Sequence, residues 1–264
     1  MTDRVDLHDS IMVSPTGARL SKSDHPGLPV TNVEIAAAAQ ACFEAGAGAL
    51  HLHVRDDAGR HSLDAGRYAD AMAAVAEAAP AMAVQITTES GGIYSAQDQA
   101  ACLRDVGPSW ASVALREMER DIVTARQLYR EAAERGTAIQ HILYAPGDIA
   151  RLIAWQDQGV VTPGPLSVIF VLGHYDGGPA RVADLGGFLS QPGARRLDWM
   201  ACAFGARERA CLVAALRLGG RARVGFENNI WQPGDRMLEN NAQSVRLLVE
   251  AADIEPNHVS EIEG

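Results

Sequence analysis

Short apolar segments alternate along this chain with longer segments in which hydrophobic residues recur every three or four positions. The short segments, typical of buried strands, span residues 11–13, 49–54, 83–87, 110–114, 137–144, 167–172, 197–203 and 222–226. The longer segments, typical of amphipathic helices, span residues 31–46, 65–79, 96–106, 122–135, 146–158, 180–189, 208–218 and 238–252. Such alternation predicts parallel strands joined by crossover helices, and a count of eight favours a closed (β/α)8 barrel, the TIM barrel, over an open doubly wound sheet.

Capping residues mark the ends of several predicted helices. Thr31 and Glu34 have the spacing of a capping box, and Gly136 and Gly159 follow two other helices.

The 264 residues, 47% of them hydrophobic, match the length of an ordinary barrel of about 250 residues. Because no linker or low-complexity segment divides the chain, we expect residues 1–264 to form a single barrel domain.

Composition narrows the possible partners and the compartment. A formal net charge of −10 without any Lys/Arg-rich run argues against nucleic acid as a partner. This net charge is still compatible with a local basic pocket for an anionic ligand. The four cysteines lie among apolar residues without C-x-x-C spacing, which favours reduced thiols over disulfides or a cysteine zinc site. No apolar run approaches the about 20 residues needed to span a bilayer, and the polar start of the chain resembles no targeting signal. We expect a soluble, cytoplasmic protein with no membrane partner.

The second predicted strand carries the most distinctive chemistry. Because strand side chains alternate between faces, His51, His53 and Arg55 are expected to point to one side. Two imidazoles on one face at the end of a strand are half of a metal site. The alternative is a pair of polar core residues held by hydrogen bonds.

Other polar residues fall at the ends of predicted strands, where TIM barrels carry their sites. These residues are Thr87, Thr88 and Glu89 after the third strand, and Arg223, Glu227, Asn228 and Asn229 at the eighth. Glu227 is the natural third ligand, because two imidazoles and one carboxylate suit Zn²⁺, or another divalent ion, and leave a position open for substrate. A salt bridge between Glu227 and Arg223 is the alternative.

Three stretches make the sequence recognisable: residues 51–55 (His-Leu-His-Val-Arg), 170–173 (Phe-Val-Leu-Gly) and 223–230 (Arg-Val-Gly-Phe-Glu-Asn-Asn-Ile). Together they resemble the motifs of the β-keto acid cleavage enzymes, and shorter matches extend the resemblance over nearly the whole chain. It implies a zinc-dependent TIM barrel, usually a homo-oligomer (dimer or tetramer). It also implies condensation of a β-keto acid with the co-substrate acetyl-CoA, which gives acetoacetate and a new CoA thioester.

The resemblance also implies roles for particular residues. The zinc ligands of the family fall on His51, His53 and Glu227, and its motif arginine falls on Arg223. The substrate-contacting residues are expected to be Thr87, Thr88, Arg55 and Asn229.

The chain departs from the family where the general base is expected. Asn228 stands in place of an aspartate that pairs with the motif arginine, and an amide cannot accept the proton. Glu89, where the family has glycine, is a candidate replacement base; the alternative is a solvated loop acid.

A second departure concerns the substrate. Arg19 stands where the family's 3-keto-5-aminohexanoate cleavage enzyme has a glutamate that holds an amino group. The opposite charge predicts a different substrate, with an anionic or polar distal group such as the second carboxylate of a dicarboxylic keto acid, unless Arg19 simply faces water. The loop after the sixth strand adds His174 and Asp176. We therefore expect a divergent member of the family.

Two other functions stay open. The same site could serve a metal-assisted aldolase, lyase or decarboxylase that does not use CoA. Alternatively, the loss of the base at Asn228 could leave a metal-binding sensor without catalytic activity.

Overall fold

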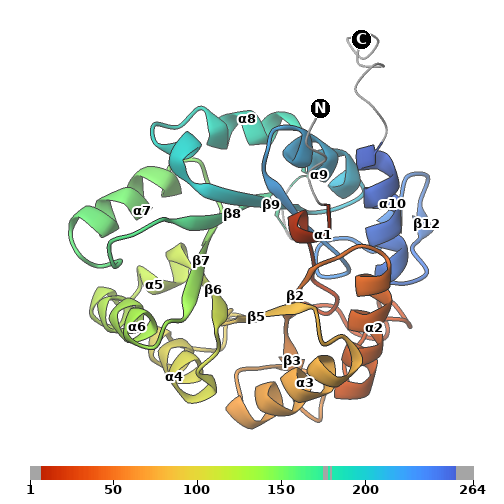
Figure 1. Cartoon of the computed structure of the whole chain (residues 1–264), viewed down its shortest axis with the longest axis horizontal. Helices are drawn as coiled ribbons and strands as arrows, with labels where there is room; N and C mark the ends of the chain where they lie inside the picture. The colour runs from red at the N-terminus through yellow and green to blue at the C-terminus, as the bar shows by residue number, and fades with distance from the viewer. Residues whose placement is uncertain (1–6, 175–177, 179, 254–264) are drawn as a thin grey trace.

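The computed structural model describes residues 7–174, 178 and 180–253. Eight parallel strands close into a barrel, as Figure 1 shows: β1 (Ile11–Val13), β2 (Ala49–Leu52), β5 (Ala83–Thr87), β6 (Trp110–Ala114), β7 (Ala138–Leu143), β8 (Ser167–Leu172), β9 (Asp198–Ala203) and β10 (Arg221–Val224). The barrel closes because β1 pairs with β2 on one side and with β10 on the other. The predicted (β/α)8 barrel is thus confirmed, and the open sheet is excluded.

Helices surround the ring of strands (Figure 1). The eight that follow the strands are α2 (Asn32–Glu44), α3 (Ala65–Ala78), α4 (Ala96–Val106), α6 (Ile122–Glu134), α7 (Asp148–Asp157), α8 (Ala183–Leu189), α9 (Glu208–Arg217) and α10 (Asn241–Asp253). The capping box predicted at Thr31 and Glu34 is present at the start of α2. Three shorter helical segments were not predicted: α1 (Leu7–Ser10), α5 (Leu115–Met118) and η1 (Ala194–Arg196).

Some predicted boundaries move because local hydrogen bonds end the elements earlier or start them later. The strand predicted over 49–54 ends at Leu52, and the chain continues into an antiparallel hairpin of β3 (Val54–Arg55) and β4 (His61–Ser62). A second hairpin, β11 (Trp231–Gln232) with β12 (Arg236–Met237), precedes α10. The helix predicted from residue 238 starts later, because Asn240 Oδ1 accepts the backbone N–H of Gln243 and caps it there.

Strand alternation divides the hydrophobic core into two layers. In β8, Val168, Phe170 and Leu172 pack outward against the helices, whereas Ile169 and Val171 pack inside the barrel. In β2, Leu50 and Leu52 join the outer layer in the same way. His51 therefore points into the barrel, as the alternation predicts.

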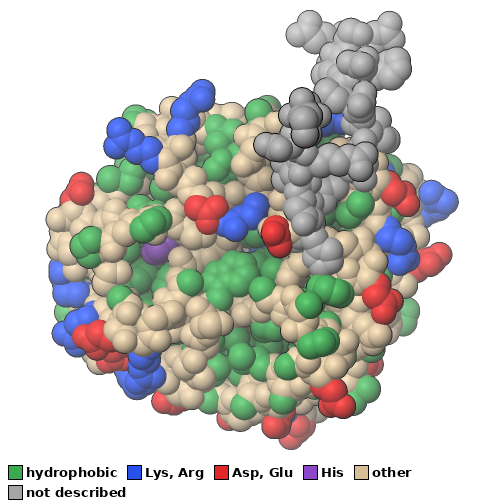
Figure 2. Space-filling view, viewed as in Figure 1, with side chains coloured by type: hydrophobic (Ala, Val, Ile, Leu, Met, Phe, Trp, Pro, Cys, Tyr) green, Lys and Arg blue, Asp and Glu red, His purple; other side chains and the backbone are tan. Residues whose placement is uncertain are grey.

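The surface visible in Figure 2 carries acidic and basic side chains interspersed around its rim. Hydrophobic side chains are more frequent toward the middle of the same face. Within the described part of the chain, no helix combines the length and the apolar character that crossing a bilayer requires.

Candidate metal centre

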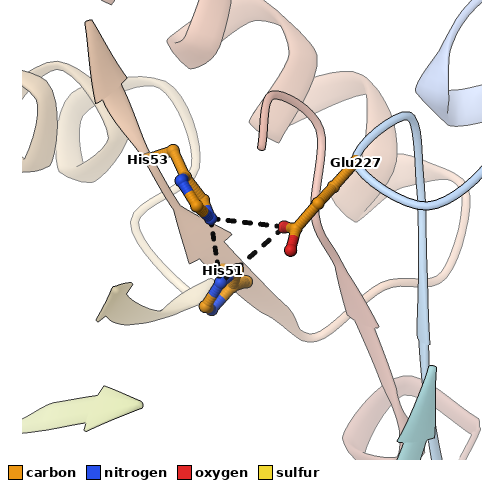
Figure 3. Close-up of side chains that lie close together, drawn as sticks. All are labelled: His51, His53 and Glu227. Carbon is orange, nitrogen blue, oxygen red and sulfur yellow. Dashed lines mark hydrogen bonds and ion pairs between the residues drawn. The ribbon is translucent and has the colours of Figure 1, made fainter. Parts of the chain in front are cut away.

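Three buried side chains converge at the C-terminal end of β2, as Figure 3 shows. His51 Nε2 lies 3.2 Å from His53 Nε2, and Glu227 Oε2 lies 3.7 Å from the first of these nitrogens and 3.4 Å from the second. The exposed fractions of the three residues are 1%, 0% and 7%. The structure therefore brings together the three residues that the sequence nominates as metal ligands.

The geometry of this triad fits a tetrahedral divalent ion. Two ligand atoms about 2.0–2.1 Å from such an ion stand about 3.3–3.4 Å apart, close to the three separations in this site. Gln85 Oε1 lies 2.7 Å from His51 Nδ1 and can only accept a hydrogen from it. This hydrogen bond leaves the lone pair of Nε2 on the side that faces His53 and Glu227, the orientation that metal-binding histidines usually have.

The electrostatics around His51 and Glu227 favour the protonation states of these two residues that a bound cation needs. Burial, together with the nearby Arg223 guanidinium, lowers the pKa of His51 well below its usual value, so the imidazole is neutral. Burial alone raises the pKa of Glu227, but the Arg223 guanidinium opposes this effect and holds the pKa well below its usual range. Neutral imidazoles and an ionised carboxylate are the forms that bind Zn²⁺.

A polar pair inside the barrel supports His51. Gln85 Nε2 donates to Gln140 Oε1 at 3.1 Å, and both glutamines are fully buried. Sequence reasoning missed this pair, although a glutamine in the middle of an apolar strand is a signal of a buried polar contact. Such a contact fixes the ring orientation of the histidine and hence the direction of its free nitrogen.

The loop after β10 is shaped so that Glu227 turns toward the histidines. Gly225 has a φ of +144°, and a Cβ there would lie 2.4 Å from Ser14 O, so only glycine fits. The N–H of Glu227 then donates to the same oxygen of Ser14 at 3.1 Å. Arg223 Nη2 donates to Glu227 Oε1 at 3.0 Å, which leaves Oε2 facing the imidazoles.

Glu208, at the start of α9, is a second buried carboxyl that the sequence did not reveal. It accepts the backbone N–H of Gly225 at 3.1 Å and the side-chain amide of Asn229 at 3.4 Å. Burial raises the pKa of Glu208 to about 8. Glu208 therefore ties α9 to the loop that carries Glu227.

Asn228 and Arg223 are not paired with each other in the way that the family's aspartate and arginine are expected to be. Arg223 Nη2 donates to Glu227 Oε1, and Asn228 Oδ1 accepts from Ser14 Oγ at 3.4 Å. Asn228 Nδ2 is buried and has no hydrogen-bond partner among the described residues. The side chain can thus offer an N–H to a ligand, but it cannot take up a proton.

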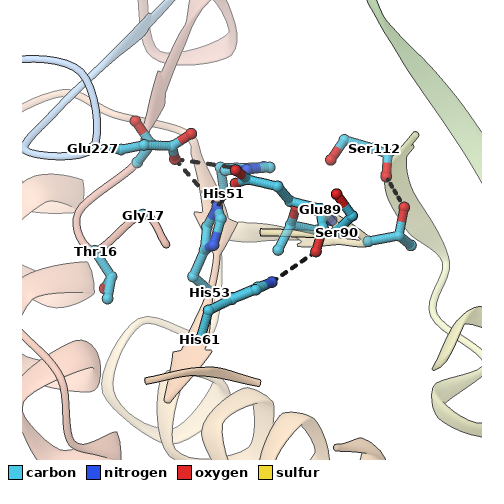
Figure 4. Close-up of polar contacts among 12 residues, drawn as sticks. Thr16, Gly17, His51, His53, His61, Glu89, Ser90, Ser112 and Glu227 are labelled. Atoms are coloured by element: carbon cyan, nitrogen blue, oxygen red, sulfur yellow. Dashed lines mark hydrogen bonds and ion pairs between the residues drawn. The ribbon is translucent and has the colours of Figure 1, made fainter. Parts of the chain in front are cut away.

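Glu89 lies beside the triad, as Figure 4 shows, with Oε2 3.9 Å from His53 Nε2. Burial raises its pKa, an effect that His53 opposes and Glu227 reinforces. His61, on β4, donates from Nε2 to the backbone oxygen of Glu89 at 2.7 Å, and its ring centroid lies 5.3 Å from that of His53. Glu89 is therefore no solvated loop acid, and His61 is a neighbour that the sequence did not identify.

The predicted substrate-contacting residues differ in how many hydrogen bonds their polar groups already make within the protein. Thr87 Oγ1 accepts the N–H of Glu89 and keeps its own hydrogen to donate, whereas Thr88 Oγ1 donates to Ser112 O at 2.9 Å. The amide of Asn229 donates to and accepts from the backbone of Trp231. Substrate contact by these residues stays a prediction, and Thr87 has the most available hydroxyl.

Arg55 holds the first loop. From its Nη2 it donates to Thr16 O, Gly17 O and Leu20 O at 3.2, 2.6 and 2.9 Å, and from Nη1 to Gly59 O at 2.9 Å. Buried among these carbonyls, Arg55 acts on the backbone of the loop, and direct contact with substrate stays a prediction.

Two residues predicted near the mouth of the site lie in exposed positions. Arg19 is exposed, yet near enough to Glu89 to lower the pKa of that carboxyl. His174 is exposed in the loop after β8. Asp176, predicted in the same loop, lies outside the described residues.

Comparison with known proteins extends the resemblance noted in the sequence. A 3-keto-5-aminohexanoate cleavage enzyme from Fusobacterium nucleatum is 28% identical and covers 89% of this chain and 88% of its own. A 3-oxoadipate:acetyl-CoA acetyltransferase from Cupriavidus necator is also 28% identical and covers 89% and 85%. Among solved structures, a ternary complex of ObcA with a C4-CoA adduct and oxalate superposes with a TM-score of 0.65 at 18% identity, which supports the fold. This match covers 85% of the present chain, which spans 63% of the ObcA chain.

The model of one protein family, the beta-keto acid cleavage enzymes, matches residues 10–262. This match covers nearly all of the sequence and every residue of the metal centre. The chain therefore belongs to the β-keto acid cleavage enzyme family.

Proposed function

We propose that this protein is a zinc-dependent enzyme that exchanges acyl groups between a β-keto acid and acetyl-CoA. The triad of His51, His53 and Glu227 carries the proposal, because it offers three ligands and leaves a fourth position open at the mouth of the barrel. Support also comes from the family match and from the acetyl-CoA acetyltransferase named among the relatives. Other divalent ions suit the same ligands.

The overall reaction is R–CO–CH₂–COO⁻ plus acetyl-CoA, giving CH₃–CO–CH₂–COO⁻ (acetoacetate) plus R–CO–S–CoA. The carbon between the keto and carboxylate groups loses a proton and attacks the acetyl carbonyl, which expels the CoA thiolate. The thiolate then attacks the original keto carbon, the old C–C bond breaks, and the proton returns to acetoacetate. One side chain that first accepts and later returns this proton is sufficient.

The residues of the candidate metal centre would have different roles in this reaction. A bound divalent ion would act as a Lewis acid toward the substrate's oxygens. His51, His53 and Glu227 would hold it, and Arg223 would keep Glu227 ionised and oriented through their 3.0 Å contact.

Glu89 is the proposed general base. Asn228 cannot accept a proton, whereas burial brings the pKa of Glu89 closer to neutral pH while its carboxylate stays beside His53. The buried N–H of Asn228 Nδ2 is suited to donate to a substrate oxygen instead.

We further propose that the substrate is a dicarboxylic β-keto acid. Arg19 stands at the mouth within electrostatic range of Glu89, and a guanidinium binds a carboxylate in a bidentate manner. One relative is named for 3-oxoadipate, which has a second carboxylate. A homo-oligomer, either dimer or tetramer, and a cytoplasmic location stay predictions.

The test combines metal analysis with a substrate panel. Purified protein is expected to contain about one zinc per chain and to form acetoacetate from acetyl-CoA and at least one dicarboxylic keto acid. His51→Gln is expected to abolish both properties. His141→Gln is the control, because His141 is also buried but packs against Tyr129 rather than the triad. A protein without metal, in which His51→Gln changes nothing, would rule out the proposed centre.

The same panel separates the alternative functions. Turnover that persists without acetyl-CoA would favour a CoA-independent lyase, aldolase or decarboxylase. Tight binding of keto acids without turnover, converted to turnover by Asn228→Asp, would favour a sensor that has lost its base.

A further inference from the structure

The turn that carries Glu89 is held by a second buried carboxylate, that of Glu117. Glu117 lies on the short helix α5, directly after β6, and is 5% exposed. Its Oε2 accepts the backbone N–H of Ser90 at 3.0 Å, and its Oε1 accepts the Ser90 hydroxyl at 2.7 Å. Both carboxylate oxygens therefore bind the residue that follows Glu89 in the chain.

A neighbouring helix completes this contact. Gln99, on α4, is 1% exposed. In the orientation that pairs each donor with an acceptor, its amide nitrogen donates to Glu117 Oε2 at 3.2 Å and to Thr88 O at 3.0 Å. The three hydrogens that Glu117 accepts offset the cost of burying its carboxylate. Helices α4 and α5 therefore both hold the turn after β5.

The backbone of Glu89 is held by two further residues. Thr87 Oγ1 accepts its N–H at 3.0 Å, and His61 Nε2 donates to its carbonyl oxygen at 2.7 Å, as Figure 4 shows. Gly91 permits the close approach of His61, because a Cβ at Gly91 would lie 3.0 Å from His61 Cδ2. These hydrogen bonds, with that of the Ser90 N–H, define the path of the backbone on both sides of the Glu89 side chain.

This backbone support matters because the Glu89 carboxylate has little support of its own. Within the described part of the chain, it makes no hydrogen bond, and its Oε2 lies 3.9 Å from His53 Nε2. Its distance from the candidate metal centre therefore depends on the turn. A displacement of about 1 Å at a reacting group can lower a rate about 100-fold.

We propose that Glu117 is a positioning residue for the general base: through Ser90, it determines where the Glu89 carboxylate stands beside the candidate metal centre. The choice of Glu89 as the base rests on the proposed function, whereas the contact of Glu117 with the turn does not. Both oxygens of Glu117 face Ser90, so the role of Glu117 is distinct from direct contact with substrate.

The contact requires the shape of the Glu117 side chain and not its negative charge. A glutamine can place its oxygen where Oε2 accepts the Ser90 N–H, and its nitrogen can donate to the Ser90 hydroxyl oxygen. Glu117→Gln should therefore preserve the turn, whereas Glu117→Ala removes both acceptors. A carboxylate that itself moved a proton would be inactivated by either substitution.

Asp148→Ala is the matched control for Glu117→Ala. Asp148 is 6% exposed at the start of α7, and its Oδ2 accepts the backbone N–H groups of Tyr144 and Ala145 at 2.8 and 2.9 Å. The control thus removes a buried carboxylate that supports the loop after β7 instead of the loop after β5. His61 is left unchanged, because its ring also lies beside that of His53.

The experiment has two measurements. The first is hydrogen exchange of the Ser90 amide, followed by NMR in the metal-free protein without substrate, so that its result does not depend on turnover. The second is kcat and KM for acetoacetate formation from acetyl-CoA and a dicarboxylic keto acid, with Glu89→Gln measured in the same assay.

We expect the Ser90 amide to exchange about tenfold faster or more in Glu117→Ala, and within about twofold of the wild type in Glu117→Gln and Asp148→Ala. In Glu117→Ala, kcat should fall by about tenfold or more while KM stays within about twofold. Glu117→Gln should keep kcat within about threefold of the wild type. Simple loss of stability would not produce this difference between kcat and KM.

Three results would each overturn the proposal. They are unchanged Ser90 exchange in Glu117→Ala, equal acceleration of that exchange by Asp148→Ala, and a kcat that falls as far in Glu117→Gln as in Glu117→Ala. An unchanged kcat in Glu117→Ala, together with an inactive Glu89→Gln, would overturn it as well. Absence of acetoacetate formation in the wild type would instead refute the proposed function, and Ser90 exchange would still decide whether Glu117 holds the turn.

Discussion

Gly17→Ala is a small change that should separate metal binding from folding. Gly17 has a φ of +60° and lies directly against Glu227. A Cβ at this position would stand 2.7 Å from Glu227 Cγ, 3.0 Å from its Cβ and 3.1 Å from its Cα. Because one of these atoms belongs to the backbone, rotation of the glutamate side chain alone cannot relieve the contact.

Two separate effects are expected, one on stability and one on zinc affinity. The left-handed conformation costs an alanine about 1–2 kcal/mol relative to glycine. Ordinary contact begins near 3.4 Å, so the 2.7 Å approach requires Glu227 to move by about 0.7 Å. Metal–ligand distances are held to about 0.2 Å. We therefore expect the zinc affinity to fall by about 10- to 100-fold, or about 1.4–2.8 kcal/mol.

Gly107→Ala is the matched control, because Gly107 has a φ of +58° and nothing lies within 4 Å of a Cβ there. Zinc affinity is measured by competition with a coloured chelator, and the free energy of unfolding of the metal-free proteins by urea titration. Both variants should lose stability, but only Gly17→Ala should lose zinc affinity. Equal zinc affinity in the two variants would refute the argument that Gly17 determines the position of Glu227.

Three other predictions concern the support, the stability and the specificity of the centre. Gln85→Leu removes the acceptor that orients His51, so it should lower zinc affinity about 10- to 100-fold in the same chelator assay, and an unchanged affinity would contradict this role. Because burial raises the pKa of Glu208 from 4.5 to about 8, the folded state binds its proton more tightly than the unfolded state does, and stability should fall as the pH rises from about 5 through 8. Urea titrations should show this fall in the wild type and a flatter profile in Glu208→Gln, whereas parallel profiles would contradict it. Arg19→Glu should shift kcat/KM from dicarboxylic toward amino-substituted keto acids, and an unchanged ranking of substrates would show that the charge at this position does not select the substrate.

The barrel could be predicted from the sequence because each strand and helix carries its own periodic pattern. The inward position of His51 followed from strand alternation, and the start of α2 from the capping box at Thr31. The β3–β4 hairpin was missed, since its strands have two residues each and no pattern of that length is informative. The start of α10 was placed too early because Leu238 continues the apolar pattern, although it packs with Leu28 and Phe226 in a separate cluster.

The convergence of the three candidate metal ligands could be predicted because their chemistry is unusual in the segments that carry them. The residues that hold them in place could not. In the sequence, Glu208 is an ordinary acidic residue at the start of a helix, and only the packing of α9 against β10 makes it a buried partner of the Gly225 loop. The contact between Gly17 and Glu227 joins opposite ends of the chain, so no local pattern encodes it.

We expect the first loop to keep substrate selection, at Arg19, separate from the support of the candidate metal centre. Arg55 binds the backbone oxygens of Thr16, Gly17 and Leu20, so the path of the loop depends on carbonyl groups that every residue type provides. The Arg19 side chain, in contrast, is exposed, and it lies in the stretch that Arg55 holds. A substitution at position 19 should therefore cost little stability and leave Gly17 packed against Glu227. On this basis, the charge presented to the distal end of the substrate can change while the geometry of the metal centre stays the same.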